Sequence, residues 1–491
     1  MIRAPALMTG LVLTVLVSTT LAREEDAEHP AVAIVLRPAA EPVPALKYRI
    51  LPERSTQIPG NAAIFYHRAI LMFQDTRQRT RRAKESPATE EQASGQWITG
   101  PLNAIPHDQA RQWLETYRSS LHETELGARR LTCNWEFDSR TEGIELMLPE
   151  MQEMRALGRL VALRARFAVL DGKIDEAVYW IQTGYAMARH VSEGPILIQS
   201  LVGVSLSELM AKVLEDLIQA PGTPSLYWAL ANRPRPFIDM TAAYEGERFD
   251  LEREVPQLRE LDGVPWSVEK ARMFTAELQE KLFKFAGLAA RAPSASGSGG
   301  VQDWSYKLGL AALVAQAYPE AKRALIAQRR PAAQVEAMPA VQVAALHTFQ
   351  SYQQLRDDVF KWTGLPYYQA YKAMDGSSTT RQSHANMNML LKLFTMLLPA
   401  IRSVQVAQLR ADRHLDAIEC IEAIRLYAAA HGQFPRKLEE ISEAPAPIDP
   451  ATGHPFDYRV EGDRAILSAP SPPGAPDIPQ FKINYELKWT R

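Results

Sequence analysis

The strongest constraint on the fold is residues 154–217, which hold three helical patterns separated by short breaks. Residues 151–170 and 174–188 each carry apolar side chains at steps of three and four, which places them on one face of a helix. Gly172 lies in the three-residue break between them, where it can adopt the left-handed conformation that ends a helix. Two helices joined by so short a turn must lie antiparallel and bury their apolar faces against each other.

The third pattern begins near Pro195, which suits a first helical turn because its missing N–H would be unpaired there. It runs to Leu217, and a Pro-Gly pair follows shortly afterwards. The first half of this helix is apolar almost all round, so it must be buried on several sides. We expect it to form the centre of the core, with Leu201 and Val204 among the core residues.

The first two helices resemble one tetratricopeptide repeat, in which small residues let paired helices approach closely. The resemblance rests on the spacing of Ala165, Gly172, Ala177 and Ile181. Arg164 and Ala168 depart from it, because that repeat favours a large apolar residue and an aromatic residue there. The resemblance implies a body built from antiparallel helical hairpins.

Composition sets limits on the class of protein. The chain has 491 residues, which is too long for one simple core, so more than one lobe is expected. Hydrophobic residues make up 46% and charged residues 23%, as in ordinary globular proteins. The formal net charge of -2 provides no basic field, so we do not expect a nucleic-acid partner.

Residues 1–22 have the layout of a secretory signal peptide. Arg3 precedes an apolar run at 7–17, and small residues follow up to Ala22, where we expect cleavage. The alternative is an uncleaved anchor, because the run is near the lower length for a membrane span. No Cys follows the cleavage position, which disfavours a lipid-anchored protein. The segment predicts export to the periplasm or the extracellular space, with no stable membrane span after cleavage.

Composition divides the rest of the chain into three parts. Residues 23–60 are rich in Pro, Ala and charge and predict an extended lead-in. Residues 61–398 form a helical body, with a solvated loop at 76–96 and a flexible Pro-Ser-Gly loop at 292–300. Within that body we expect further helices at 108–131, 238–261, 341–371 and 386–398, and an irregular proline-rich segment at 227–239.

Residues 399–491 predict one long helix followed by a small antiparallel sheet. The helix ends at Gly432 and carries an apolar stripe made of Ala417, Ile421, Ile424, Tyr427 and Ala428. The ranges 456–460, 465–468 and 482–489 alternate in the manner of strands. The expected fold is therefore mainly α: antiparallel helical hairpins in a solenoid-like body, with a small C-terminal helix and antiparallel β-sheet module.

Several segments resemble one family of uncharacterised exported proteins found in planctomycete-type bacteria: 188–195, 226–230, 234–239, 423–427 and 449–456. That resemblance implies no known activity. The tail also resembles, more loosely, the C-terminal half of type II secretion pseudopilins, where a helix leads to a small sheet through an Asp-Pro-x-x-Gly-x-Pro turn. The chain departs from pseudopilins in lacking their methylated N-terminal helix, so we expect shared architecture rather than shared function.

The two cysteines, Cys133 and Cys420, leave two interpretations open. Export permits a disulfide between them. Cys420, however, lies beside Ile421 on the apolar stripe of the C-terminal helix, where a free Cys behaves as a small buried hydrophobe. The stripe favours the second interpretation. Since the sequence contains no C-x-x-C motif, thiol redox catalysis is not expected.

Three groups of polar residues are candidates for chemistry. His190 and Glu193 could begin a metal site, but no further ligand is nearby, and a His near a helix C-terminus is favoured by the dipole alone. The carboxylates at 245–254 alternate with Arg, which is typical of a solvated, ion-paired helix face. Asp449 could join a Ca²⁺ site, but its Pro-Gly surroundings predict a turn. We therefore expect no metal and no cofactor, and the catalytic residues, if any, stay unknown.

Two hypotheses for function follow. The first is an exported, non-enzymatic scaffold with a protein partner, because the chain combines helical hairpins with no recognisable catalytic motif. The second is an enzyme whose site is assembled from distant residues near Arg189, His190 and Glu193 and the segment from Arg233 to Asp239. A deep pocket in which His, Arg and carboxylates converge would favour the enzyme.

Overall fold

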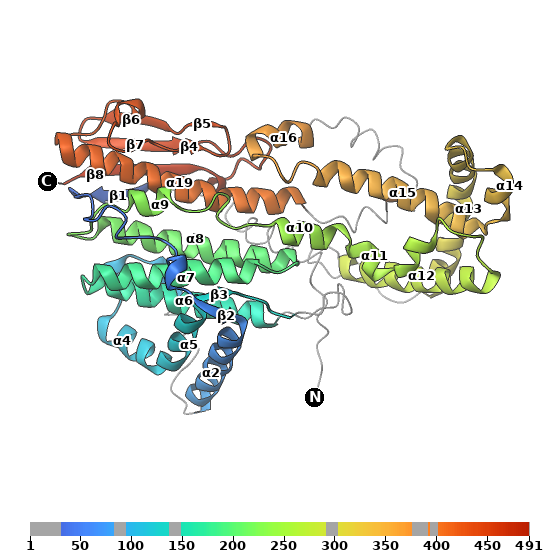
Figure 1. Ribbon diagram of the computed structural model, residues 1–491, viewed down its shortest axis with the longest axis horizontal. Helices are drawn as coiled ribbons and strands as arrows, with labels where there is room; N and C mark the ends of the chain where they lie inside the picture. Colours follow the sequence, from blue (N-terminus) through green and yellow to red (C-terminus); the bar gives the residue numbers. More distant parts are fainter. Residues whose placement is uncertain are drawn as a thin grey trace.

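The computed structural model describes residues 31–82, 95–136, 149–290, 303–375, 391–392 and 401–490. The predicted signal peptide and the predicted loop at 292–300 lie outside these residues, as does nearly all of the predicted helix at 386–398. The described chain is mainly helical with a small sheet, as predicted. Figure 1 shows a large helical body with the sheet on one side and a narrower helical arm extending from it.

The three predicted central helices are confirmed as α6 (Pro149–Leu170), α7 (Ile174–Ser192) and α8 (Leu197–Gln219). Gly172 lies between α6 and α7 with a φ of 70°, the left-handed conformation that its position predicts. α8 packs against α6, α7 and the long C-terminal helix α19 (Ile401–His431). The expectation that the third predicted helix is central is therefore correct.

Small residues let the three central helices approach closely. A Cβ added to Gly158 on α6 would lie 2.1 Å from the Leu206 side chain on α8. A Cβ added to Gly203 on α8 would lie 2.6 Å from the backbone carbonyl oxygen of Ala188 on α7. Both distances are far below van der Waals contact. The backbone neighbour of Gly203 cannot move aside, whereas the Leu206 side chain beside Gly158 would have to change its rotamer.

Leu201 is less buried than the prediction of a core residue requires. Val204 is only 2% exposed, whereas Leu201 is partly buried and packs at the edge of the core. Among the described residues, α8 alone is long and apolar enough to cross a membrane, and 67% of its most apolar window is buried inside the protein. That burial is what a core helix of a folded body requires.

The N-terminal part of the body adds α2 (Ala63–Arg82), α4 (His107–Thr116) and α5 (Arg118–Ala128), with a two-stranded parallel pair of β2 (Ile58–Asn61) and β3 (Arg130–Thr132). The prediction of a solvated loop from residue 76 is wrong over its first part, since α2 continues to Arg82. Polar residues fill this last stretch of α2 because it extends away from the core, where a helix needs no apolar stripe.

The sheet contains β6 (Asp457–Glu461), β7 (Arg464–Ala469) and β8 (Ile483–Trp489), which agree with the three predicted strands. They pair antiparallel in the order β6-β7-β8, with Ala465 opposite Leu487. A fourth strand, β1 (Val32–Leu36), was not predicted and comes from the segment expected to be an extended lead-in. It pairs parallel to β8, with Ile34 opposite Leu487.

The helix α19 lies between α8 and the sheet and is buried on almost every side. The predicted apolar stripe is confirmed, since Ile421 and Ile424 are fully buried. The charged residues of the opposite faces are buried as well, including Arg413 and Arg425. The prediction of an irregular segment at 227–239 is wrong over its first residues, which form the short helix α9 (Tyr227–Ala231). α9 packs against α19.

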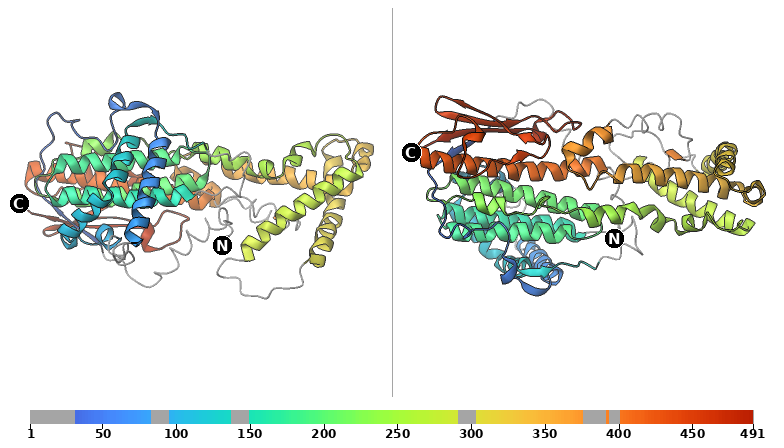
Figure 2. Two further views of the ribbon diagram at one scale, coloured as in Figure 1. Left: turned by 90° about the horizontal axis from the view of Figure 1, so that it is seen from below. Right: turned by 45° about the horizontal axis from the view of Figure 1, so that its top comes forward.

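The arm has its own hydrophobic cluster, separate from that of the body. It contains α11 (Asp250–Glu254), α12 (Val268–Ala290), α13 (Asp303–Ala327), α14 (Ala332–Ala337) and most of α15 (Ala340–Phe360). Both views of Figure 2 place this arm beyond one end of the body. α10 (Thr241–Arg248) leads into the arm and α15 returns from it, followed by α16 (Tyr367–Asp375).

The charged run at 245–254 is ion-paired, as predicted, but it is not simply a solvated face. Glu252 is only 5% exposed and Glu254 only 7%. Arg356 of α15 contacts the Glu252 carboxylate at 2.7 Å, and Lys281 of α12 contacts the Glu254 carboxylate at 3.0 Å. The partners come from distant parts of the chain, so the sequence spacing within the run did not reveal them.

Candidate functional site

The segment from Arg233 to Asp239, which the sequence analysis singled out, separates two hollows in the protein surface. One is a pocket of about 440 Å³ beside the end of α7, which we call the arginine pocket. The other is a cleft of about 1270 Å³ between α19, α10 and the α15–α16 connection, which we call the interlobe cleft. Arg189 and Pro234 line both hollows.

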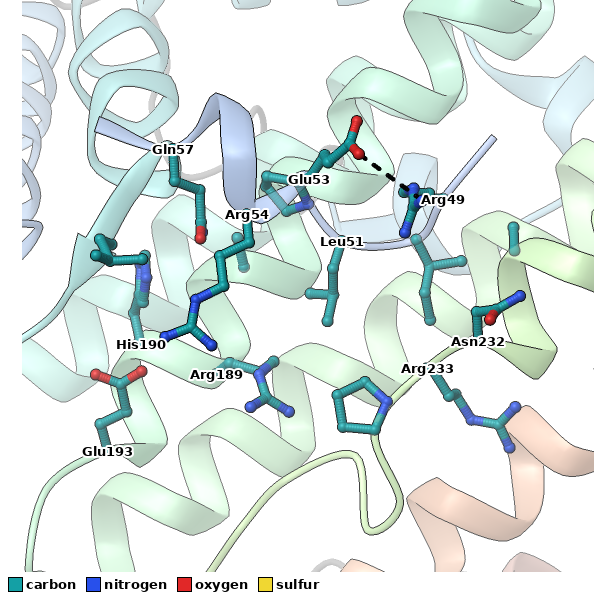
Figure 3. A pocket seen from close by; sticks show the side chains of 16 residues that line it. Arg49, Leu51, Glu53, Arg54, Gln57, Arg189, His190, Glu193, Asn232 and Arg233 are labelled. Carbon is teal, nitrogen blue, oxygen red and sulfur yellow. Dashed lines mark ion pairs between the residues drawn. The ribbon is translucent and has the colours of Figure 1, made fainter. Parts of the chain in front are cut away.

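The arginine pocket collects basic side chains from three parts of the chain. Arg49 and Arg54 come from the segment that precedes β2, Arg189 from the last turn of α7, and Arg233 from the segment after α9. Figure 3 shows the Arg54 side chain pointing toward Arg189 across the pocket. Glu53 lies on the far side from Glu193 in the same view. The pocket therefore brings together residues that are far apart in sequence.

His190 is a structural residue of the core. Its ring is buried, and its Nδ1 shares a hydrogen bond of 2.9 Å with the Tyr66 hydroxyl. The ring also hydrogen-bonds the backbone of Arg130. Burial lowers the pKa of His190 to about 4, with the nearby Arg189 charge acting in the same direction. His190 does lie in the last turn of α7, as predicted, but burial disfavours the charged form with which the helix dipole would interact.

Glu193 is the C-cap residue of α7. Its carboxylate accepts a hydrogen bond from the backbone N–H of Cys133 at 3.1 Å. Burial raises the pKa of Glu193, while that backbone hydrogen bond and the charge of Arg189 act in the opposite direction. No group of three or more His, Cys, Asp or Glu side chains within the described ranges is arranged to hold a metal ion.

The segment from Arg233 to Asp239 is tied to α19 by buried ion pairs. The Arg233 guanidinium is buried and donates to the carboxylates of Asp416 and Glu419. Arg235 adds a hydrogen bond of 2.6 Å to Glu419. Burial alone would lower the pKa of Arg233, but the two carboxylates raise it. These groups satisfy one another and hold the segment in place.

The floor of the interlobe cleft is one face of α19. Gln405, Leu409, Asp412, Asp416 and Glu419 line it at steps of three and four, so they share that face. Asp412 accepts a hydrogen bond of 2.8 Å from the backbone N–H of Phe237. Burial raises the pKa of Asp412 to about 7, and the Phe237 N–H opposes that rise. Burial therefore favours the protonated form of this carboxyl group more than in an exposed Asp.

Gln405 adds an unused acceptor to the same floor. The residue is 8% exposed, and its Oε1 has no hydrogen-bond partner among the described residues. A buried carbonyl oxygen without a partner costs about 1–3 kcal/mol. Asp412 thus offers a hydrogen-bond acceptor to a molecule that enters the cleft, whereas the Gln405 amide oxygen is covered by protein atoms.

The walls of the cleft are mainly apolar. Tyr244 and Phe360 are buried in contact with each other, and Leu365 is 45% exposed. Prolines form much of the rim, from three separate segments: Pro234, Pro236, Pro366, Pro445, Pro447 and Pro450. Since proline loses little conformational entropy on folding, this rim holds its shape without a ligand.

Asp449 is not a calcium ligand. Arg413 contacts both of its carboxylate oxygens, at 2.8 Å from Nε and 2.7 Å from Nη2, and both residues are buried. The Asp449 carbonyl accepts the N–H of Gly453 at 2.8 Å, and Gly453 has a φ of 73°. The predicted turn is confirmed, and the carboxylate serves to hold it on α19.

Cys133 and Cys420 are both free and buried, so no disulfide joins them. Burial raises the thiol pKa of each residue far above its usual range. The interpretation of Cys420 as a small buried hydrophobe on the stripe of α19 is confirmed.

Sequence reasoning missed the acidic residues of α19. Asp412, Asp416 and Glu419 follow one another at steps of four and three, so one helix face was predictable for them. A solvated face was the natural interpretation, because nothing in the sequence shows that Arg233 and Phe237 reach that face. No protein family, curated protein or solved structure matches this chain in the comparisons with known proteins.

Proposed function

We propose that this chain is an exported, non-enzymatic binding protein whose interlobe cleft takes an extended peptide segment that carries a basic side chain. The observation that carries the proposal is the Asp412 carboxyl group on the floor of an apolar, proline-rimmed cleft. The helical-hairpin body, the suggested tetratricopeptide-like pairing of α6 with α7 and the pseudopilin-like tail would then serve as a scaffold for that cleft.

The size of the cleft favours a peptide over a small metabolite. Its volume of about 1270 Å³ exceeds the range of roughly 300–1,000 Å³ that is usual for small-molecule pockets. Apolar walls with a few polar groups suit an extended segment, whose apolar side chains bury area while its backbone donates hydrogen bonds.

Charge favours a Lys or Arg side chain at the floor. Asp416 and Glu419 are already paired with Arg233 and Arg235. Among the described residues, the Asp412 carboxylate accepts a hydrogen bond from the backbone N–H of Phe237, and the charges of Arg233 and Arg235 act on it from farther away. A cation beside Asp412 would ionise it fully and lower its pKa. Affinity for a basic peptide should therefore rise as the pH increases from about 6 to 8, since less free energy is then needed to remove the proton.

Binding of arrayed peptides to the purified protein tests the proposal. Asp412→Asn should weaken the binding of Lys- or Arg-containing peptides by about tenfold, because a charge-assisted hydrogen bond is lost. The matched control is Asp463→Asn, since Asp463 lies in the exposed β6–β7 turn. Absence of any bound peptide, or equal affinity in both variants, would count against the proposal.

The pKa of Asp412 favours one second candidate, an enzyme that uses this carboxyl group as a general acid or base. A group that titrates near 7 is suited to proton transfer at neutral pH. Asp416 lies one helical turn away on the same floor. Assays with chromogenic ester, peptide and glycoside substrates would separate the two functions. Turnover that disappears in Asp412→Asn would establish the enzyme, and absence of turnover with intact peptide binding would exclude this role.

A further inference from the structure

The arginine pocket holds guanidinium groups that lack carboxylate partners. Among the described residues, no carboxylate oxygen lies within the 4.0 Å ion-pair distance of Arg54 or Arg189. Arg189 donates from Nη1 to the carbonyl oxygen of Phe237 at 2.7 Å, which leaves its other N–H groups available. Arg49 has one distant carboxylate, Glu53 at 3.8 Å. These three cations line one small hollow.

The arrangement is unfavourable without a counterion. Like charges that face each other repel, and the partly buried guanidinium of Arg189 also loses hydration. Burial lowers the pKa of Arg189, and the charges of Glu193 and Asp239 offset only part of this. The protein therefore holds cationic groups in a position that a bound anion would stabilise.

The remaining lining residues fit the same chemistry. The Asn232 side chain and the Gln57 side chain are amides, which can accompany Arg in oxyanion recognition. One carboxylate oxygen of Glu193 accepts the backbone N–H of Cys133, and the charge of Glu193 offsets part of the positive charge of Arg189. Arg233 is committed to Asp416 and Glu419 and does not contribute a free charge.

We infer that the arginine pocket is a binding site for an oxyanion, the phosphate or carboxylate group of a small ligand, held by Arg54 and Arg189. Arginine is suited to this because its planar fork can donate two parallel hydrogen bonds to either group. The pocket volume of about 440 Å³ accommodates a small molecule but not a folded partner. This site does not depend on peptide binding in the interlobe cleft.

Titration of the full-length protein with inorganic phosphate and with succinate, at low ionic strength, tests the inference. Isothermal calorimetry should give saturable binding of at least one of the two anions, and the stronger of them identifies the ligand class. Arg54→Gln should weaken that binding by about tenfold to a hundredfold, which is the usual contribution of a charged hydrogen bond. Arg54 is exposed, so this variant should fold normally.

The control is Arg79→Gln, because Arg79 is an exposed arginine of α2 whose partner is Asp75. It should bind the anion as well as the unmodified protein does. Added NaCl should weaken binding to both proteins, because the interaction is electrostatic. The inference is overturned if neither anion binds saturably, or if Arg54→Gln and Arg79→Gln bind equally well.

Discussion

Asp412 shows how one side chain can couple the stability of this protein to pH. An Asp in an unfolded chain has a pKa of about 3.9, whereas burial raises the pKa of Asp412 in the folded protein to about 7. Between these values the folded state binds more protons than the unfolded state. The contribution of Asp412 to the free energy of unfolding must therefore fall as the pH rises from about 4 to about 7.

The first prediction is that Asp412→Asn makes stability less dependent on pH. Three pKa units correspond to at most about 4 kcal/mol, and partial exposure of the residue reduces this. The free energy of unfolding of the variant minus that of the unmodified protein should therefore be larger at pH 8 than at pH 5. Urea midpoints at both pH values measure it, with Asp463→Asn as control. Parallel changes in Asp412→Asn and the unmodified protein would contradict the assigned pKa.

Arg413 and Asp449 form a buried pair with a different role. Each is 1% exposed, and the guanidinium also donates to the carbonyl oxygens of Phe481 and Pro470. The pair thus joins three segments of the C-terminal module to α19. Replacing one member of such a buried pair destabilises a protein far more than replacing both with apolar residues, because a single replacement leaves a buried charge without a partner.

The second prediction is therefore that Arg413→Met destabilises the protein by about 3–5 kcal/mol. The double variant Arg413→Met, Asp449→Leu should recover part of this loss, since no buried charge is left. Arg459→Met is the control, because Arg459 pairs with Glu461 on the surface and should change stability by about 0.5 kcal/mol or less. Chemical denaturation measures all three. A double variant no more stable than Arg413→Met would refute the explanation.

At the scale of elements, α7 and α8 approach each other closely at two glycines, and the neighbouring atoms differ between the two positions. Gly203 faces the carbonyl oxygen of Ala188, which is backbone and cannot move independently. A Cβ at Gly184 would lie 2.2 Å from the sulfur of Met210, which belongs to a flexible side chain. The distances are similarly short, but the neighbours differ in how easily they can shift.

The third prediction is that Gly203→Ala destabilises the protein by about 1–3 kcal/mol, the usual cost of overpacking a core. Gly184→Ala should cost clearly less, because Met210 can adopt another rotamer and alanine raises helix propensity by up to about 1 kcal/mol. Thermal unfolding of the two variants gives the comparison. Equal losses would mean that Met210 is as rigid as the backbone.

Elements with a strong local period were predictable, and elements that depend on distant partners were not. The periodicity of α6, α7, α8 and α19 gave their positions to within a few residues. β1 is only five residues long, and its partner β8 lies at the opposite end of the chain. The arginine pocket was anticipated at Arg189, but Arg49 and Arg54 lie in a lead-in that offered no signal. The floor of the interlobe cleft was missed because its partners, Arg233 and Phe237, are distant in sequence from the acidic residues of α19.

At the scale of the whole molecule, two hydrophobic clusters meet at a cleft. The body cluster includes α19 and the sheet, so the C-terminal segment is an integral part of the body rather than an appended module. The arm cluster is joined to the body through α10 and the α15–α16 connection. The interlobe cleft lies where these parts meet, which is a common position for binding sites.

The fourth prediction concerns export. We expect the mature protein to begin at Arg23, because the signal-peptide layout of residues 1–22 ends in small residues at Ala22. N-terminal sequencing of the protein from the periplasm or the medium measures it. Retention of residues 1–22 on a membrane-bound product would instead identify an anchor.

The pairing of β1 with β8 has a consequence for how the chain reaches its folded state. β1 is among the earliest parts to be made, and β8 is among the last. Ile34 and Leu36 must therefore wait, without their neighbours, until Leu487 has been synthesised. Contacts of such long sequence separation form slowly. The four-stranded sheet can therefore be completed only after β8 has been synthesised.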